Sequence, residues 1–271
     1  MRPILIALAL LLAATVSGQA QTLPNHVDPS ARDAVPNLTA VPAIRFLTTP
    51  DYPPFNFRDS NGELIGFNVD LARAICDELS IACTVQAWPW EQAGNALADR
   101  QGDALIAGLA ITPETGERFD FSSIYLMLPG RFVVGKTAAA DTFDPARLAG
   151  KRVGVRGESA HAAFLARYLG SAVAVPFESE TLALDALARN EVDAVFADAL
   201  RASFWLNERA DCCAFVGQPY FRPELFGEGL AVALAPGQDA VRQAIDYALV
   251  RLKRSGVFDE IFLRWFPVDF Y

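Results

Sequence analysis

The chain is 271 residues long, carries a formal net charge of −9 at pH 7, and contains four cysteines and only two histidines. The negative charge repels nucleic acid and excludes it as a partner. The sequence contains no HExxH zinc motif, no GxxxxGKS/T phosphate loop and no Ser-His-Asp arrangement. We therefore expect no metal site and no cofactor.

Residues 1–20 have the composition of a secretory signal peptide. Arg2 precedes an unbroken apolar run from residue 4 to residue 16, and residues 18–20 (GQA) form a small-x-small cleavage site. The run is shorter than the roughly 20 residues that span a bilayer. Cleavage would release a soluble, exported chain with a net charge of −10, because Arg2 is lost. Residues 21–42, without periodicity, are predicted to be an N-terminal lead-in.

The first predicted elements are two strands and a helix. Residues 43–47 form a short apolar strand, and three prolines make residues 48–55 a stiff loop. Apolar residues at helical spacing from Val69 to Leu79 predict a helix, with Asn68 or Asp70 as its cap. Residues 83–87 form the second strand.

The cysteines fall in two local groups, and export makes disulfides the default. Cys76 and Cys83 lie at the end of the predicted helix and the start of the next strand, within reach of each other. The adjacent Cys212 and Cys213 leave three possibilities open: a local disulfide, two reduced thiols, or a bond to another partner. The absence of CxxC spacing argues against a four-cysteine zinc site.

An internal repeat is the most informative pattern. Residues 95–108 align without gaps with residues 185–198, and in each copy a helix ends at a polar turn and leads into a short buried strand. Each copy also follows an earlier strand and helix. Two similar α/β units explain this pattern most simply, with chance similarity as the alternative. Such alternation predicts mainly parallel sheets, with ligands beyond the carboxyl ends of the strands.

Eight short motifs in unbroken order resemble the bacterial extracellular solute-binding proteins of family 3, the periplasmic receptors of polar-amino-acid ABC importers. The similarity covers roughly residues 43–271. Each motif is weak alone, and the ordered set carries the resemblance. The motifs are residues 52–55 (YPPF), 66–71 (GFNVDL), 111–114 (ITPE), 119–122 (FDFS), 153–155 (VGV), 192–194 (VDA) with Asp198, 226–229 (FGEG) and 252–256 (LKRSG).

The resemblance implies an α/β, two-lobed periplasmic-binding-protein fold (type II), each lobe a mainly parallel sheet flanked by helices, with a two-strand hinge. Lobe 1 is expected at residues 43–127 and 228–271, and lobe 2 at residues 128–227. The implied function is the periplasmic substrate-binding component of an ABC importer. Its expected partners are a small-molecule ligand and the membrane permease, and the chain is expected to be a monomer. The Cys76–Cys83 spacing also resembles a disulfide of basic-amino-acid receptors in this family.

The resemblance also assigns a ligand site. In relatives a Tyr after the first strand stacks on the ligand, which corresponds to Tyr52, and a second aromatic corresponds to Trp90, with Trp88 nearby. A carboxylate that ends a strand of lobe 2 binds the ligand's amine, and Asp198 stands there; a helix cap is the alternative role. The expected ligand-binding residues are Tyr52, Trp88, Trp90, Gly108, Ala110, Thr115, Glu158, Ser159 and Asp198.

One departure from the family pattern bears on the ligand. Relatives hold the α-carboxylate with an Arg directly after the ITPE-like motif, where this chain has Thr115. Burying a carboxylate without a cation costs several kcal/mol. We therefore expect an amine, an amino-acid-like solute or a neutral polar molecule rather than a standard α-amino acid. Three cations could still supply the missing charge: Arg118, Arg156 and Arg222.

Two alternative functions share this fold. A periplasmic dehydratase acting on prephenate-like acids needs cations for two carboxylates and a proton-transferring acid such as Glu158 or Asp198, and the missing Arg counts against it. His161 is expected at a helix start, in a surface or capping role. A ligand-sensing module would normally continue into a membrane span, whereas this chain ends at Tyr271. We expect a binding protein and no enzyme.

Overall fold

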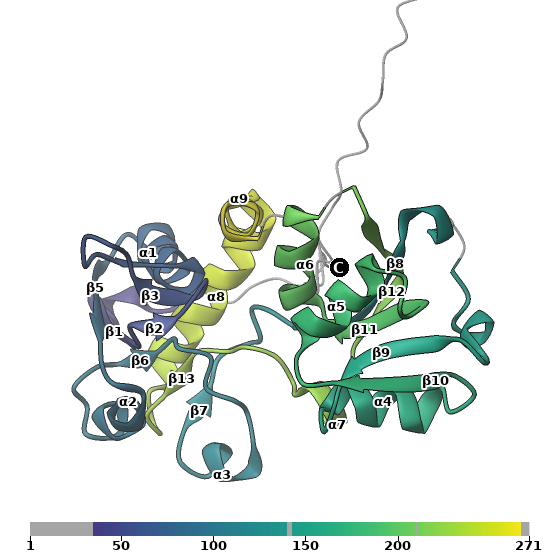
Figure 1. Ribbon diagram of the computed structural model, residues 1–271. Helices are drawn as coiled ribbons and strands as arrows, with labels where there is room; N and C mark the ends of the chain where they lie inside the picture. The colour runs from purple at the N-terminus through teal and green to yellow at the C-terminus, as the bar shows by residue number, and fades with distance from the viewer. Residues whose placement is uncertain (1–34, 140–142, 210, 267–270) are drawn as a thin grey trace, which may run out of the picture.

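The computed structural model describes residues 35–139, 143–209, 211–266 and 271. The predicted signal peptide and most of the lead-in lie outside these residues. The structure is built around two five-stranded sheets, each covered by helices, that lie side by side (Figure 1). We call the first sheet with its helices lobe 1 and the second lobe 2. Among the described residues, no helix is both long and apolar enough to cross a membrane.

The sheet of lobe 1 has the strand order β5-β1-β6-β13-β7. Strand β1 pairs in parallel with β5 and β6, whereas β13 pairs antiparallel with β6 and β7. Segments from both ends of the described chain therefore share this sheet. The strands are β1 (Ala43–Thr48), β5 (Ala82–Ala87), β6 (Ala104–Leu105), β7 (Asp120–Phe121) and β13 (Ala233–Leu234).

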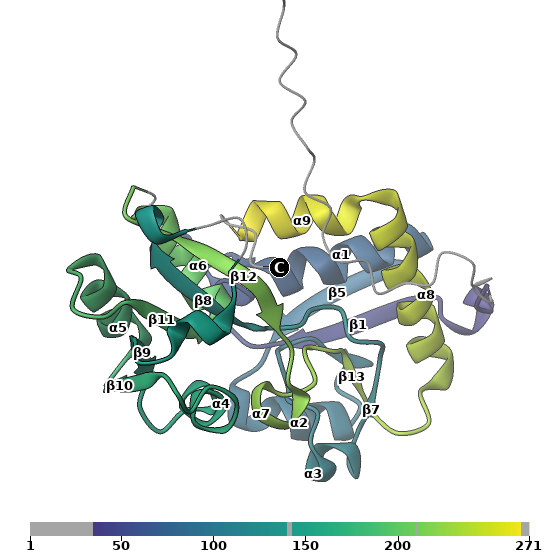
Figure 2. The same cartoon turned by 90° about the vertical axis from the view of Figure 1, so that its right-hand side faces the viewer.

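Helices from both ends of the chain also pack together on lobe 1. In Figures 1 and 2, α8 and α9 lie against α1, and contacts between all three pairs of these helices hold them there. The helices of this lobe are α1 (Phe67–Leu79), α2 (Trp90–Ala98), α3 (Pro113–Gly116), α8 (Asp239–Ser255) and α9 (Val257–Trp265), after a 3-10 turn at Leu38–Ala40. A small three-stranded sheet completes the lobe: β2 (Asp51–Tyr52), β3 (Asn56–Arg58) and β4 (Leu64–Ile65).

The sheet of lobe 2 has the order β10-β9-β11-β8-β12. Its strands are β8 (Gly130–Gly135), β9 (Arg152–Arg156), β10 (Val173–Phe177), β11 (Ala194–Asp198) and β12 (Cys213–Tyr220). Strand β9 pairs in parallel with β10 and β11, and β8 pairs antiparallel with β11 and β12. The helices are α4 (Ala160–Tyr168), α5 (Glu180–Ala188), α6 (Ala199–Glu208) and α7 (Pro223–Phe226), with 3-10 turns at Lys136–Ala138 and Pro145–Leu148.

Both sheets have the α/β architecture that the sequence predicts, and each contains two antiparallel pairings beside its two parallel ones. The parallel pairings join strands that the helix–strand alternation identifies. The antiparallel ones involve β7, β8, β12 and β13, which lie outside the repeated units. These strands outside the repeated units therefore make both sheets mixed rather than purely parallel.

The internal repeat is confirmed in backbone detail. Helices α2 and α5 end at corresponding turns, where Arg100 and Asn190 both adopt left-handed φ values of 57° and 58°. After each turn an aspartate accepts a backbone hydrogen bond from the strand beside it: Asp103 from Arg45 N at 2.8 Å and Asp193 from Arg152 N at 2.7 Å. The two α/β units therefore share a helix end and a strand anchor.

Two segments connect the lobes and run beside each other. Leu126 and Leu230 form an antiparallel bridge, in which Leu230 N donates to Leu126 O at 2.7 Å. The lobes have separate apolar cores. The main core of lobe 1 lies between β1 and helices α1, α8 and α9, and includes Phe46, Ile75 and Phe262. Lobe 2 packs the rings of Phe132, Phe164 and Phe196.

Both cysteine pairs form disulfides. Cys76 is joined to Cys83, as expected from their spacing, and this bridge ties the end of α1 to the start of β5. Cys212 is joined to its neighbour Cys213. Of the possibilities that the sequence left open for this second pair, the structure has the local disulfide.

The predicted cap of α1 is wrong. The helix begins at Phe67 after Gly66, which gives no side-chain cap. Asn68 is fully buried instead, donating to Asn56 Oδ1 at 2.7 Å and accepting from Tyr125 Oη at 2.8 Å. Its amide serves a buried polar network that connects three segments, a role that local spacing does not reveal.

Candidate functional site

Tyr52 presents an exposed ring at the edge of lobe 1. Tyr52 lies in β2, and one face of its ring stacks on the Phe55 ring at a centroid distance of 4.9 Å. The residue is 39% exposed. The ring also lies over Gly108, just beyond β6, where an added Cβ would come within 3.0 Å of Tyr52 Cε1. Gly108 has a φ of +75°, which favours glycine. The structure thus brings together two of the predicted site residues.

The two predicted tryptophans differ in their surroundings. Trp88 is partly buried and packs against the small apolar cluster that contains Leu97 and Phe119. Trp90 is the first residue of α2 and is 46% exposed. Of the two, Trp90 therefore has more surface available to a ligand.

Thr115 is occupied by local hydrogen bonds. It lies in the short helix α3, where it forms a reciprocal capping box with Thr112. Its hydroxyl also donates to Ala110 O at 2.7 Å. Thr115 and Ala110 therefore stabilise the loop between β6 and β7.

Asp198 lies where lobe 2 meets lobe 1. It is the last residue of β11 and the N-cap of α6, with Oδ1 accepting from Arg201 N at 2.9 Å. The next residue, Ala199, donates its N–H to Pro129 O at 2.9 Å. Ala199 and Leu200 pack with the main apolar core of lobe 1. The helix-cap role considered for Asp198 is confirmed, and the first turn of α6 lies against lobe 1.

Charges from lobe 2 act on Tyr52 of lobe 1. Burial raises the pKa of the Tyr52 hydroxyl, the charge of Asp198 raises it further, and the charge of Arg201 lowers it. Because Coulomb interactions weaken with distance, these effects place Asp198 and Arg201 within electrostatic reach of the Tyr52 ring. An aromatic face, a carboxylate and a guanidinium therefore share one region between the lobes.

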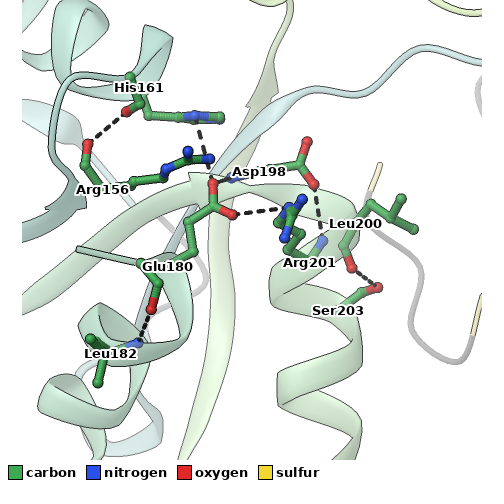
Figure 3. Close-up of polar contacts among 10 residues, drawn as sticks. Arg156, His161, Glu180, Leu182, Asp198, Leu200, Arg201 and Ser203 are labelled. Atoms are coloured by element: carbon green, nitrogen blue, oxygen red, sulfur yellow. Dashed lines mark hydrogen bonds and ion pairs between the residues drawn. The ribbon is translucent and has the colours of Figure 1, made fainter. Parts of the chain in front are cut away.

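A buried carboxylate, Glu180, organises the lobe 2 side of this region (Figure 3). It is the first residue of α5, is 7% exposed, and its Oε1 accepts from Asp198 N at 3.3 Å. Arg201 Nε lies 3.3 Å from its Oε2. Burial and the neighbouring Asp198 charge raise the pKa of Glu180, and burial raises the pKa of Asp198.

The expectation of a surface or capping role for His161 is wrong. Its ring stacks on Phe226 at 4.8 Å and also contacts Phe196. Burial, followed by the positive charge of Arg156, lowers the pKa of His161 to about 4. The imidazole is therefore neutral at pH 7, and its 3.8 Å approach to Glu180 Oε1 is not an ion pair under those conditions.

The predicted turn at Glu158 and Ser159 connects β9 to α4. Ser159 is the N-cap of α4: its hydroxyl accepts from Ala162 N at 3.2 Å and donates to Arg156 O at 2.7 Å. Glu158 is exposed, with a left-handed φ of 51°. An open cavity of about 610 Å³ lies beside this turn, lined by Arg156, Gly157, Glu158, Pro176, Phe177 and Glu178.

Sequence reasoning missed Glu180 and Arg201. Glu180 follows Ser179, the N-cap of α5, so its position resembles that of any solvated acid in a first helical turn. Only the packing of α5 beside β11 buries it next to Asp198. Arg201 follows Asp198 by three residues, and that spacing alone does not distinguish a site residue from a surface cation.

Comparisons with known proteins identify the family of the chain. Residues 44–268 match the model of the bacterial extracellular solute-binding proteins, family 3. The L-arginine-binding protein of Pseudomonas aeruginosa is 30% identical over 243 residues, which cover 88% of this chain and 93% of the relative. By its name, that relative is a binding protein.

Solved structures show the same fold. The L-cystine solute receptor of Neisseria gonorrhoeae in its unliganded open conformation has a TM-score of 0.74 at 20% identity, and covers 84% of this chain and 94% of its own. An ancestral cyclohexadienyl dehydratase has a TM-score of 0.71 at 21% identity, and the match covers 87% of this chain and 98% of that chain. At these identities the likeness concerns the fold alone. From the family match over most of its length, the chain belongs to the bacterial extracellular solute-binding proteins of family 3.

Proposed function

We propose that this protein is the periplasmic substrate-binding component of an ABC importer and captures a small polar or cationic solute between its lobes. The observation that carries the proposal is the position of Asp198, a largely buried carboxylate within electrostatic reach of the exposed Tyr52 ring from the other lobe. The arginine-binding relative supports a ligand with a cationic group. The permease of the importer is the expected protein partner.

The chemistry of the site favours an amine. An ammonium group beside Asp198 gains a charge-assisted hydrogen bond, and an adjacent aromatic face adds roughly 0.5–2 kcal/mol of cation–π attraction. Tyr52 supplies one such face, and the exposed Trp90 is the candidate for the second. Gly108 allows the Tyr52 ring to approach the β6 end closely.

The lobe 1 side offers little to a carboxylate. Thr115 stands in place of the family's arginine, and its hydroxyl is bonded within its own loop. Arg118 donates to Asn95 Oδ1 at 3.0 Å and covers the Phe119 ring. On the lobe 2 side, Arg222 lies over the Tyr168 ring. These partners argue against Arg118 or Arg222 as substitutes for the missing charge.

We extend the proposal to the domain boundaries and the export signal. Lobe 1 would comprise residues 43–127 and 228–271, and lobe 2 residues 128–227, in keeping with the sheet to which each strand belongs. Residues 1–20 would be removed on export to the periplasm. Mass spectrometry of the mature protein from a periplasmic extract tests the cleavage site.

Isothermal titration calorimetry tests the proposed ligand class. Wild-type protein should bind L-arginine or its decarboxylated counterpart agmatine, and D198N should weaken that binding about 10- to 100-fold, because a charge-assisted hydrogen bond is lost. Asparagine remains a good helix cap, so D198N should keep its fold. Unchanged affinity in D198N would refute the assigned role of Asp198.

The dehydratase alternative rests on the shared fold of the ancestral enzyme. It requires cations for two substrate carboxylates, and the loss of the arginine at Thr115 removes one of them. We therefore propose that the protein has no dehydratase activity. Incubation with prephenate and detection of phenylpyruvate by absorbance checks this directly.

A further inference from the structure

Arg201 is held in place by Glu180 and by its own helix. Its Nε lies 3.3 Å from Glu180 Oε2, and its backbone N donates to Asp198 Oδ1 at 2.9 Å. Glu180 is itself buried and fixed, since it accepts from Asp198 N. The Arg201 side chain is therefore held beside Asp198 by its contact with Glu180.

The outer edge of this guanidinium is available. The Arg201 side chain is 70% exposed although Nε is paired. Within the described parts of the chain, no hydrogen bond engages either Nη group of Arg201. Because the two Nη groups form a planar fork that matches a carboxylate, their free edge can bind one bidentately.

The charges around Glu180 favour a further anion. The charges of Arg201 and Arg156 both act on this single carboxylate (Figure 3). Asp198 is the second acid beside Arg201: burial raises the pKa of Asp198, and the charge of Arg201 opposes that rise. A bound ammonium would occupy Asp198 and leave Arg201 with only Glu180, which it shares with Arg156.

We propose that Arg201 binds an anionic group of the solute from lobe 2, so that the ligand is a small zwitterion held by Asp198 at its ammonium group and by Arg201 at its carboxylate. This inference rests on the proposed function and specifies its ligand class. It moves the carboxylate contact from the lobe 1 loop of Thr115 to the first turn of α6, and so replaces the expectation, drawn from Thr115, that a standard α-amino acid is not the ligand. Glu180 acts as a positioning residue, because it pairs with Nε and leaves the Nη groups of the largely exposed side chain to the ligand.

Two matched ligand pairs test the proposal by calorimetry: L-arginine against agmatine, and L-ornithine against putrescine. The members of each pair differ by one carboxylate. Wild-type protein should bind the carboxylated member of at least one pair about 10-fold or more tightly. R201Q should abolish that preference by weakening the binding of the carboxylated member alone. R201K, which keeps the positive charge, should show part of the preference.

The control variant is R209Q, at the other end of the same helix. Arg209 is 50% exposed and pairs with Asp185, so its loss should leave both members of each pair unaffected. E180Q provides a second variant, which should reduce the preference without abolishing amine binding. Circular dichroism and thermal unfolding establish that each variant is folded.

The outcomes separate the inference from the proposed function. Equal affinity of wild-type protein for both members of each pair, or equal weakening of both by R201Q, overturns the zwitterion inference and leaves the amine site at Asp198 intact. Affinity that is unaffected in D198N overturns the proposed function. Failure of the wild-type protein to bind any of the four compounds overturns both.

Discussion

Asp198 combines two physical roles in one side chain. It caps α6 through Oδ1 and lies near the Tyr52 ring of the other lobe. D198A should therefore lower the free energy of unfolding by about 1 kcal/mol, the usual loss for an N-cap. D198N should lose much less, because asparagine is also a good N-cap. Urea denaturation of the two variants measures the difference; equal losses would mean that the cap contributes nothing here.

Gly108 controls how closely the Tyr52 ring can approach β6. G108A would place a Cβ within 3.0 Å of Tyr52 Cε1 at a φ of +75°. We expect a loss of roughly 1 kcal/mol in unfolding free energy and weaker ligand binding, because the residue is strained and the ring is displaced. Gly116 is a matched control, since its Cβ would meet no atom within 4 Å. A wild-type affinity in G108A would contradict this role for the ring position.

His161 makes stability depend on pH. Its pKa is about 4 in the folded protein, below the ordinary 6.5, so the unfolded chain binds more protons between these values. The contribution of His161 to stability is thus complete above pH 6.5 and falls as the pH drops towards 4, by up to about 3 kcal/mol. H161F should remove this contribution while preserving the stack on Phe226.

The difference in unfolding free energy between wild type and H161F isolates the contribution of His161. Glu180 and Asp198 have raised pKa values and contribute in the opposite direction, because their folded forms retain protons as the pH rises. Those groups remain in both proteins. Chemical denaturation from pH 4 to pH 7 gives the difference curve, and a flat curve would show that the imidazole has the same pKa in the folded and unfolded chain.

At the scale of elements, the Cys76–Cys83 disulfide ties α1 to β5. The bridge closes a loop with a sequence separation of 7, for which chain-entropy arguments give roughly 2–3 kcal/mol. The double variant C76A/C83A should lose about that much in urea unfolding. C212A/C213A is the comparison, because a bridge between adjacent residues restricts the unfolded chain far less. Equal losses would assign the effect to side-chain packing instead.

The two repeated units end their helices and anchor their strands in the same way. Arg100 and Asn190 end their helices in the left-handed conformation, and Asp103 and Asp193 anchor the following strands to a neighbouring strand. These features recur because each unit must reverse direction after a helix and enter a parallel sheet. In the second unit the strand ends at Asp198, so the proposed site residue lies at the carboxyl end of the central strand β11, a position fixed by the fold.

At the scale of the whole molecule, two connecting segments joined at Leu126 and Leu230 link lobes with separate cores. A ligand held by Tyr52 on one side and Asp198 on the other should draw the lobes together by hinge motion. Once a ligand is identified by calorimetry, a concentration of 100 times its Kd should add about 2.7 kcal/mol to stability. Small-angle X-ray scattering should show a smaller radius of gyration, and an unchanged value would contradict closure.

The sequence by itself determined the fold and part of the proposed site. Ordered local motifs and hydrophobic periodicity depend on short stretches of chain, so they indicated the α/β units, the Cys76–Cys83 pair and the departure at Thr115. Asp198 was identified in the same way, because it directly ends a strand.

Only the tertiary structure decided which side chains share an environment. Asn68 was expected to cap a helix and instead bonds to Asn56 and Tyr125 in a buried network. Glu180 and His161 are buried because α4 and α5 pack beside the end of β11, and their pKa values shift through that burial. Burial and long-range charge depend on residues distant in sequence, and local patterns do not encode those distances.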